Sequence, residues 1–158
     1  MKKKRRSHLR GLVARLKSDE AFAFALACRL LDNIVENPVT GCWEWQRRVK
    51  SNGNGGEPYG VLCVRLPGVP HPVPFRVHVL AWILFRGPCN AGHVRAHECD
   101  NTLCCNPAHI EQKTQQHNVN DSMTRGRHSS FKNLKYFGTL GDRATRFDAR
   151  APGPDCPF

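Results

Sequence analysis

The sequence predicts an α+β fold in which helices flank a small antiparallel sheet. Two stretches have apolar residues at helical spacing, and the residues between them alternate like short strands bounded by glycine and proline. A third observation is a run of cysteine and histidine residues over 97–109, followed by a further helical pattern. The length of 158 residues suits one domain with tails.

The N-terminal part is predicted to be a basic arm followed by a helix. In residues 1–17, lysine and arginine alternate with a few apolar residues, which is typical either of a frayed terminus or of an arm that contacts nucleic acid. A helix then begins at Ser18, a candidate N-cap with acidic residues directly after it. This helix is expected to end near Glu36, before a proline.

The middle of the chain is predicted to form strands. Alternating large residues indicate a short strand over 40–45, and residues 59–66 indicate another. Between them, residues 51–56 consist of serine, asparagine and glycine, as in a flexible loop, and a turn rich in proline and glycine over 67–74 closes the second strand. We therefore expect a hairpin or a small sheet.

The next elements are a helix, a strand and a loop. Residues 77–86 have helical spacing and end at Gly87, so this helix is expected to pack on the sheet. Residues 93–97 then form a short extended segment. After the cysteine-rich loop, residues 109–111 are interpreted as a returning strand.

A last helix and a tail complete the predicted organisation. Thr114 is a candidate N-cap for a helix that reaches Arg125. Residues 128–158 are rich in glycine, proline, arginine and aspartate, which predicts a loosely ordered basic tail. The chain thus divides into an arm over 1–17, a domain over 18–127 and this tail.

The charge of the chain indicates its class of partner. Lysine and arginine number 24 against 13 aspartate and glutamate, so the net charge is +11 and the pI is about 9.7. This charge favours a polyanion, nucleic acid first, through salt-dependent contacts to phosphates. No apolar run approaches the roughly 20 residues of a membrane-spanning helix, so we expect no membrane partner.

The cysteines indicate a cellular compartment. Eight of them could form disulfides in a secreted protein, or bind metal in an intracellular one. The N-terminal residues Met1–Arg6 lead into more charge instead of the apolar core of a signal peptide. We therefore expect an intracellular protein with metal-bound and free thiols.

Three of these residues have the spacing of metal ligands. Cys99, Cys104 and His109 are each separated by four residues, close enough for a tight loop to present two thiolates and an imidazole to a tetrahedral Zn²⁺. His97 lies two residues before the first thiolate. A metal that holds Cys99 would therefore also fix the backbone of His97.

Several motifs follow one another in a fixed order over residues 41–127. They are Gly41–Trp45, Tyr59–Gly60, Phe75–His78, Leu80–Trp82, His97–His109, Thr114–Asp121 and Arg125–Arg127. This order resembles the zinc-stabilised branch of the HNH endonucleases, and within it the His-Cys box homing endonucleases. The resemblance covers somewhat more than half of the chain. It implies a ββα-metal finger, in which a strand histidine activates water and a helix asparagine binds a divalent cation.

The resemblance assigns catalytic roles to three residues. His97 would be the general base that takes a proton from the attacking water. Asn118 would bind Mg²⁺ through its side-chain oxygen, and Arg76 is a candidate for holding the phosphate. Many HNH enzymes have an acidic metal ligand directly before the catalytic histidine, whereas this chain has Ala96. A mechanism with a single catalytic cation is therefore implied.

The resemblance also implies a fourth zinc ligand. Cys42 matches the position from which the resembled enzymes recruit it, so Cys42, Cys99, Cys104 and His109 would form a closed structural site. Cys105 is an alternative to Cys104, although the motif register favours Cys104. The second zinc cluster of the His-Cys box enzymes has no counterpart, because only Cys156 follows Cys105.

Other residues near these motifs have more than one interpretation. His78 is either structural or faces a phosphate. His93 and His117 are interpreted as surface residues and the tryptophans as core residues. Asp121 is expected to cap or hydrogen-bond within the site. Arg125 and Arg127 either satisfy the helix dipole or contact phosphate.

These interpretations predict a metal-dependent HNH endonuclease of a homing, phage or mobile-element type that acts on double-stranded DNA. Hydrolysis would leave 5′-phosphate and 3′-hydroxyl ends, as the resemblance implies. Nicking or double-strand cleavage would depend on whether the chain forms a homodimer. The alternative is a non-catalytic DNA-binding module on the same zinc-stabilised scaffold.

Overall fold

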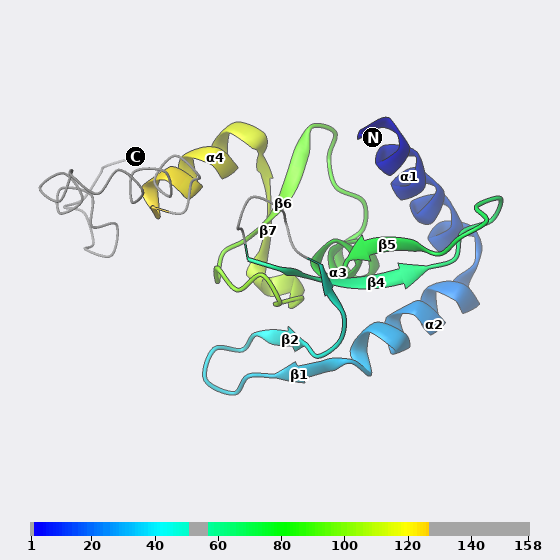
Figure 1. Cartoon of the computed structure of the whole chain (residues 1–158), viewed down its shortest axis with the longest axis horizontal. Coiled ribbons are helices and arrows are strands. Elements are labelled where there is room, and N and C mark those ends of the chain that lie inside the picture. Colours follow the sequence, from blue (N-terminus) through cyan, green and yellow to red (C-terminus); the bar gives the residue numbers. More distant parts are fainter. Residues whose placement is uncertain (1, 51–56, 127–158) are drawn as a thin grey trace, which may run out of the picture. The chain divides into compact units, whose positions relative to one another are not determined.

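The structure is a computed structural model that describes residues 2–50 and 57–126 (Figure 1). Its contacts divide the chain into two units. The first comprises Met1–Ala91 and Arg95–Gln112, and the second comprises Gly92–Val94 and Lys113–Phe158. The loop predicted over 51–56 and the tail predicted over 128–158 lie outside the described residues.

The described part of the chain is α+β, as predicted, with small sheets and four α-helices. In chain order the elements are α1 (Lys2–Ser18), α2 (Glu20–Leu31), β1 (Ile34–Glu36), β2 (Trp43–Trp45), β3 (Val49–Lys50), β4 (Tyr59–Val64), β5 (Val73–Arg76), α3 (Val77–Arg86), β6 (His93–His97), the 3₁₀ turn η1 (Pro107–His109), β7 (Ile110–Thr114) and α4 (Gln115–Thr124).

The N-terminal segment, for which the sequence left open a frayed terminus or an arm that contacts nucleic acid, is a helix over Lys2–Ser18. In α1, Leu12 is fully buried in the core, and Leu9 and Leu16 pack against the same core. These leucines lie three and four residues apart, which places them on one helix face. Burial of this face against the rest of the unit stabilises the helix. Its helical pattern is difficult to recognise in the sequence because many cations lie among the leucines.

The second helix begins one residue later and ends earlier than predicted. Asp19, not Ser18, is the N-cap of α2, and its carboxylate accepts a hydrogen bond from the Phe22 amide at 2.9 Å. The helix ends at Leu31, because Ile34–Glu36 instead pairs antiparallel with Trp43–Trp45 as β1 and β2. Cross-strand pairing therefore takes precedence over the helical pattern at these three residues.

The core of the first unit lies between the sheet and its helices. Strand β4 is central between β3 and β5 and antiparallel to both. Helix α3 begins directly after β5 and has the bounds that the sequence predicts. It buries Val77, Leu80 and Ala81 completely and packs on β4 and β5. Gly60 in β4 is required here, because a Cβ would lie 2.6 Å from the Trp45 ring.

Strands β6 and β7 form a two-stranded sheet. His109, predicted as the first residue of the returning strand, instead ends η1, and β7 begins one residue later. Thr114 is the N-cap of α4, as predicted, and its hydroxyl accepts from the His117 amide at 3.2 Å. Lys113 and Asp121 form an ion pair that joins the end of β7 to this helix.

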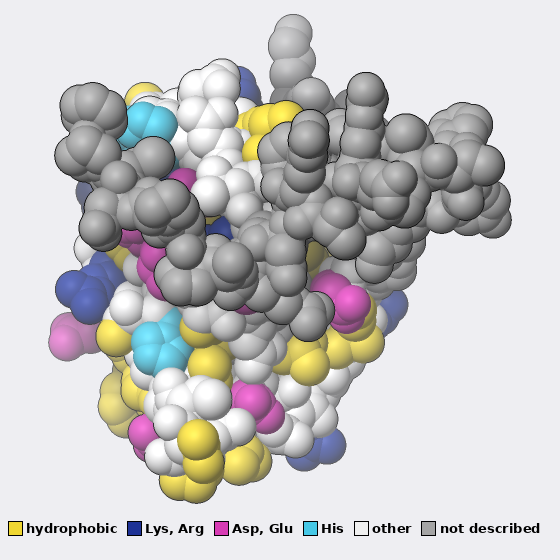
Figure 2. Space-filling model, turned by 90° about the vertical axis from the view of Figure 1, so that its left-hand side faces the viewer, with side chains coloured by type: hydrophobic (Ala, Val, Ile, Leu, Met, Phe, Trp, Pro, Cys, Tyr) yellow, Lys and Arg dark blue, Asp and Glu magenta, His cyan; other side chains and the backbone are white. Residues whose placement is uncertain are grey.

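The surface of the described residues is mixed in character. Figure 2 shows hydrophobic side chains at the lower end of one face, where the hairpin of β1 and β2 lies, and Val39 at the hairpin tip is 91% exposed. Acidic and basic side chains are interspersed over the same face. Within 2–50 and 57–126, no helix combines the length and the hydrophobicity needed to cross a membrane.

Candidate metal centre and active site

Four potential metal ligands come together in the first unit. The ligand atoms of Cys42, Cys99, Cys104 and His109 all lie within 4.8 Å of one another. The Nδ1 atom of His109 is 3.5 Å from the Cys42 sulfur and 3.7 Å from the Cys104 sulfur. Cys42 and Cys104 are buried, and the other two are half-buried. The structure thus brings together residues from two distant parts of the sequence.

Backbone pairing brings Cys42 to the loop. Directly after this residue, β2 runs beside the loop, where the Cys105 amide donates to the Trp43 carbonyl at 2.9 Å. The Trp45 amide in turn donates to the Leu103 carbonyl at 3.1 Å. Gly41, just before Cys42, has a φ of +66°, a conformation that glycine adopts without steric cost. This turn directs the Cys42 side chain towards His109.

Asn106 organises the loop itself. Its side-chain NH₂ donates to the Gly41 carbonyl at 2.8 Å, and its side-chain oxygen caps η1 by accepting from the Ala108 amide at 2.9 Å. Its backbone amide donates to the Cys104 sulfur at 3.4 Å. One residue therefore connects the segment of Cys42, the turn of His109 and a candidate ligand.

The four side chains fit a tetrahedral zinc ion. With Zn–S near 2.3 Å and Zn–N near 2.0–2.1 Å, tetrahedral geometry separates a sulfur ligand from a nitrogen ligand by about 3.5 Å. The two S···N distances of 3.5 and 3.7 Å agree with this value. Burial raises the pKa of the Cys99 and Cys104 thiols. A bound cation would reverse this effect, because it stabilises the thiolates.

Cys105 has a different environment from Cys104. Its side chain is completely buried in the hydrophobic core, and its thiol donates to the Trp43 carbonyl at 3.2 Å. Burial raises the pKa of this thiol to about 12. Cys104, not Cys105, therefore belongs to the cluster of potential ligands.

His97, at the end of β6, is connected to the cluster of potential metal ligands through a backbone atom of one of these ligands. Its Nε2 lies 2.8 Å from the carbonyl oxygen of Cys104. Because a carbonyl only accepts hydrogen bonds, Nε2 carries the proton in this contact. In the neutral ring the lone pair is then on Nδ1. Cys104 thus directs its sulfur to the cluster and its carbonyl to His97.

Aromatic rings and an arginine surround His97. The ring of His78 contacts it edge-on with centroids 4.6 Å apart, and the ring of Tyr59 is stacked at 6.2 Å. The guanidinium of Arg76 lies over the Tyr59 ring, 4.1 Å from its centroid. The structure therefore brings two predicted site residues, His97 and Arg76, into one cluster, together with His78.

His78 is a buried neutral base in this cluster. Its side chain is 3% exposed, and its Nδ1 has no hydrogen-bond partner in the described part of the chain. Burial holds its pKa well below the usual value of 6.5, and the neighbouring His97, Arg76 and Arg95 lower it further. A ring that stays neutral adds no positive charge to the two arginines beside it.

Tyr59 and Arg95 belong to this cluster, although the sequence analysis gave them no role. Strand alternation could have identified Arg95, because residues two apart in a strand point to the same face, and Arg95 is two residues before His97. Tyr59 had a weaker signal, because it was noted only as the first residue of the motif Tyr59–Gly60. Its contact with His97 depends on the packing of β4 and is not visible in local sequence.

Comparison with known proteins agrees with this geometry. Residues 75–120 match the family model described as HNH endonuclease. This part of the chain is therefore similar to HNH endonucleases, and we call residues 75–120 the HNH segment. The match extends from the end of β5 into α4 and includes Arg76, His78 and His97. It also includes three of the four clustered ligands, whereas Cys42 lies outside it.

A phage protein is similar over a longer range. The chain is 32% identical over 94 residues to Protein 2.8 of Escherichia phage T7, which is 59% of this chain. The matched region spans 58% of the phage protein. No solved structure gave a significant match to the chain.

The HNH segment also contains Asn118, in the second unit. It is half-buried in the first half of α4. Asp121, in the same helix, pairs with Lys113, and the hydrogen bond from Lys113 holds the pKa of this carboxyl below its usual value. Arg125 is the C-cap of α4, and Arg127 lies outside the described residues. The role of Asn118 towards His97 stays a prediction.

Proposed function

We propose that the protein is a metal-dependent endonuclease that hydrolyses phosphodiester bonds of double-stranded DNA, in a phage or mobile-element setting inside cells. The hydrogen bond between His97 Nε2 and the Cys104 carbonyl carries this proposal. It holds an imidazole in one tautomer at the end of a strand of the HNH segment. The similarity to a phage protein supports the setting.

His97 is the proposed general base. With the proton on Nε2, the Nδ1 lone pair accepts a proton from the water that attacks the phosphorus. The Cys104 carbonyl then stays hydrogen-bonded to Nε2–H and stabilises the imidazolium that forms. Proton transfer by a positioned base contributes typically about 10²- to 10⁴-fold to the rate.

Arg76 and Arg95 are the proposed partners of the phosphate. Both guanidinium groups lower the pKa of His78, whose ring contacts His97, so positive charge is concentrated near the place where a phosphodiester would lie. Tyr59 orients Arg76 by packing under its guanidinium. Two arginines near one phosphate match its negative charge and offer several donors.

Asn118 is the proposed ligand of the catalytic cation. Its side-chain oxygen would hold Mg²⁺, which prefers oxygen ligands and, when bound, supplies positive charge that stabilises the leaving 3′ oxygen. The position directly before His97 is occupied by Ala96 and not by an acidic residue. The DNA itself would therefore provide most of the other ligands.

Zinc has a structural role in this proposal. All four positions of a tetrahedral site are provided by side chains, so no position is left for substrate. A zinc ion held by Cys42, Cys99, Cys104 and His109 would fix the loop whose carbonyl orients His97. It would contribute to folding and not to the bond that breaks.

Cleavage of supercoiled plasmid in the presence of Mg²⁺ tests this function. We expect the wild-type protein to relax or linearise the plasmid, and His97→Ala to lose about 10²- to 10⁴-fold in rate while keeping its zinc. His93→Ala, in the same strand, is the matched control and should cleave normally. DNA binding without cleavage by the wild-type protein would instead support a non-catalytic zinc module.

The products distinguish the finer alternatives. End sequencing should find 5′-phosphate and 3′-hydroxyl termini. A nicked plasmid together with a monomeric protein, or a linear plasmid together with a dimeric protein, would show that the number of strands cut follows the oligomeric state. Sedimentation of the same protein sample measures the oligomeric state.

A further inference from the structure

Basic residues are concentrated in α1 far beyond their share of the chain. Eight of the 17 residues of this helix are lysine or arginine and none is acidic, whereas the whole chain has 24 basic and 13 acidic residues. The helix thus holds a third of the basic residues and most of the net charge. The remaining described surface is mixed in sign, as one face in Figure 2 illustrates.

The helix is ordered on the core, so its exposed face has a fixed direction. Leu12 is completely buried, and α1 packs against α2. At about 100° per residue, Arg6, Arg10 and Lys17 lie roughly 120–160° around the helix axis from Leu12. All three are exposed. They therefore form an exposed stripe along one flank of the helix, beside the face that carries Leu9, Leu12 and Leu16, and we call this stripe the basic face.

No carboxylate within residues 2–50 and 57–126 pairs with the basic face. Arg15, a cation of α1 outside the basic face, lies 3.6 Å from Asp19 and packs over the Phe22 ring. Arg15 also donates to the Arg65 carbonyl at 3.0 Å, so it fastens α1 to its surroundings. The charges of the basic face are not used in this way.

The charge distribution is unfavourable for the helix alone. The first turn of α1 contains no acidic residue, so no carboxylate there compensates the positive end of the helix macrodipole. A bound polyanion would supply that negative charge, which gives the arrangement a physical reason.

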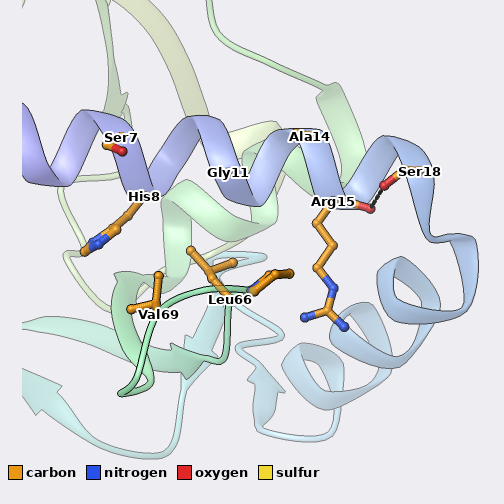
Figure 3. A pocket seen from close by; sticks show the side chains of 9 residues that line it. Ser7, His8, Gly11, Ala14, Arg15, Ser18, Leu66 and Val69 are labelled. Carbon is orange, nitrogen blue, oxygen red and sulfur yellow. Dashed lines mark hydrogen bonds between the residues drawn. The ribbon is translucent and has the colours of Figure 1, made fainter.

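A groove beside the basic face leaves room for a backbone to approach. It has a volume of about 370 Å³ and lies between α1 and the turn after β4, as Figure 3 shows. The helix side is lined mainly by small side chains, with His8 and Arg15 among them. The small residues are Ser7, Gly11, Ala14 and Ser18.

We propose that the basic face of α1 and the adjoining groove form a docking surface for the sugar-phosphate backbone of duplex DNA, separate from the His97 cluster. The proposal deepens the nuclease function and rests on it for the identity of the polyanion. The surface would supply affinity without sequence readout, because its cations contact phosphates and not base edges. It would hold the enzyme on DNA while the HNH segment acts.

The salt dependence of DNA binding tests the surface. Each phosphate contact to duplex DNA contributes about 0.9 to the slope of log K against log salt. The variant Arg6→Gln/Arg10→Gln/Lys17→Gln should therefore lower the slope by about 2–3 and raise the Kd at least about tenfold near 0.1 M salt. Cleavage at saturating DNA should stay at the wild-type rate.

A matched variant controls for net charge. Arg48→Gln/Lys50→Gln/Arg86→Gln removes the same charge from exposed positions outside α1 and should change the slope by less than about one unit. Equal losses in both variants would overturn the proposal, because binding would then follow overall charge. A circular dichroism spectrum and melting temperature like those of the wild type ensure that α1 is still folded.

Other outcomes separate this surface from the nuclease function. Cleavage with an unchanged salt slope in the α1 variant overturns only the docking surface. If the α1 variant has a lower salt slope but the wild-type protein does not cleave DNA, the docking surface is supported and the nuclease proposal is overturned. Stronger competition by duplex RNA than by DNA would contradict the proposed partner. Loss of a dimer by the α1 variant, with DNA binding intact, would identify a self-association surface instead.

Discussion

The cluster of potential metal ligands and the cluster around His97 both contact the loop that contains Cys104, but the two clusters favour ions of opposite charge. Burial raises the pKa of the Cys99 and Cys104 thiols, so their thiolates need a cation. In the His97 cluster, burial and two arginines keep His78 neutral, so cations are already present and an anion fits. This difference distinguishes the region in which a metal would stabilise the fold from the region that we propose binds the phosphate.

The two regions meet at one residue. The Cys104 sulfur faces the metal cluster, while its carbonyl accepts the hydrogen bond from His97. The orientation of the proposed base therefore depends on a loop that the metal would hold. Substitutions that act on only one side of Cys104 therefore test whether the two clusters depend on each other.

The largest effect is expected from removal of a metal ligand. Cys104→Ser should lose zinc and most of the folded structure at 25 °C, because apparent binding energies of structural zinc reach about 10–16 kcal/mol at neutral pH. Elemental analysis and circular dichroism measure the two losses. Cys105→Ser is the matched control, since its hydroxyl can still donate to the Trp43 carbonyl, and it should keep zinc. Zinc loss in the control alone would reverse the assignment.

The next effect acts on the packing under the His97 cluster. Gly60→Ala should lower the free energy of unfolding by about 1–3 kcal/mol, since the new Cβ would meet the Trp45 and Val77 side chains below 3.0 Å. Gly11→Ala, in open space within α1, should instead stabilise by about 0.5–1 kcal/mol. Urea unfolding measures both, and equal signs would contradict the packing described.

A smaller effect is expected within the metal loop. Asn106→Ala removes hydrogen bonds to the Gly41 carbonyl and from the Ala108 amide, which together contribute about 1–2 kcal/mol. Zinc affinity should fall with stability, as measured by competition with a chelator. Asn106→Asp keeps the acceptor and should lose less than Asn106→Ala. An unchanged zinc affinity in both variants would separate Asn106 from the metal cluster.

The smallest effect is a pH dependence from His78. Its folded pKa lies below the usual 6.5, so below that pH the unfolded chain binds a proton that the folded chain does not. The free energy of unfolding should then fall with acidification, by up to about 1.4 kcal/mol per pH unit from this group. His78→Asn should flatten the profile between about pH 6.5 and 5.

Local sequence was sufficient where one pattern governed an element. Helix α3 has the predicted bounds because apolar spacing and the stop at Gly87 act together, and Thr114 caps α4 as expected. Helix α1 was missed because its cations obscured three leucines at helical spacing. Strand β1 was missed because its pairing with β2 is a tertiary contact that a helical pattern cannot reveal.

The sites divide in the same way. The spacing of Cys99, Cys104 and His109 predicted a loop cluster from local sequence alone. Cys42 entered only through the resemblance, because backbone pairing between β2 and the loop positions it. Tyr59 and Arg95 near His97 also depend on packing between distant strands, which explains why no local motif identified them.

In the proposed nuclease, a structural zinc site is separate from the site of the catalytic cation. Zinc content and plasmid cleavage, measured on the same sample while Mg²⁺ is removed by dialysis and added back, test this separation. We predict one zinc per chain throughout, no cleavage without Mg²⁺, and full recovery when Mg²⁺ returns. Cleavage that persists without Mg²⁺, or that follows the zinc content instead, would contradict the account.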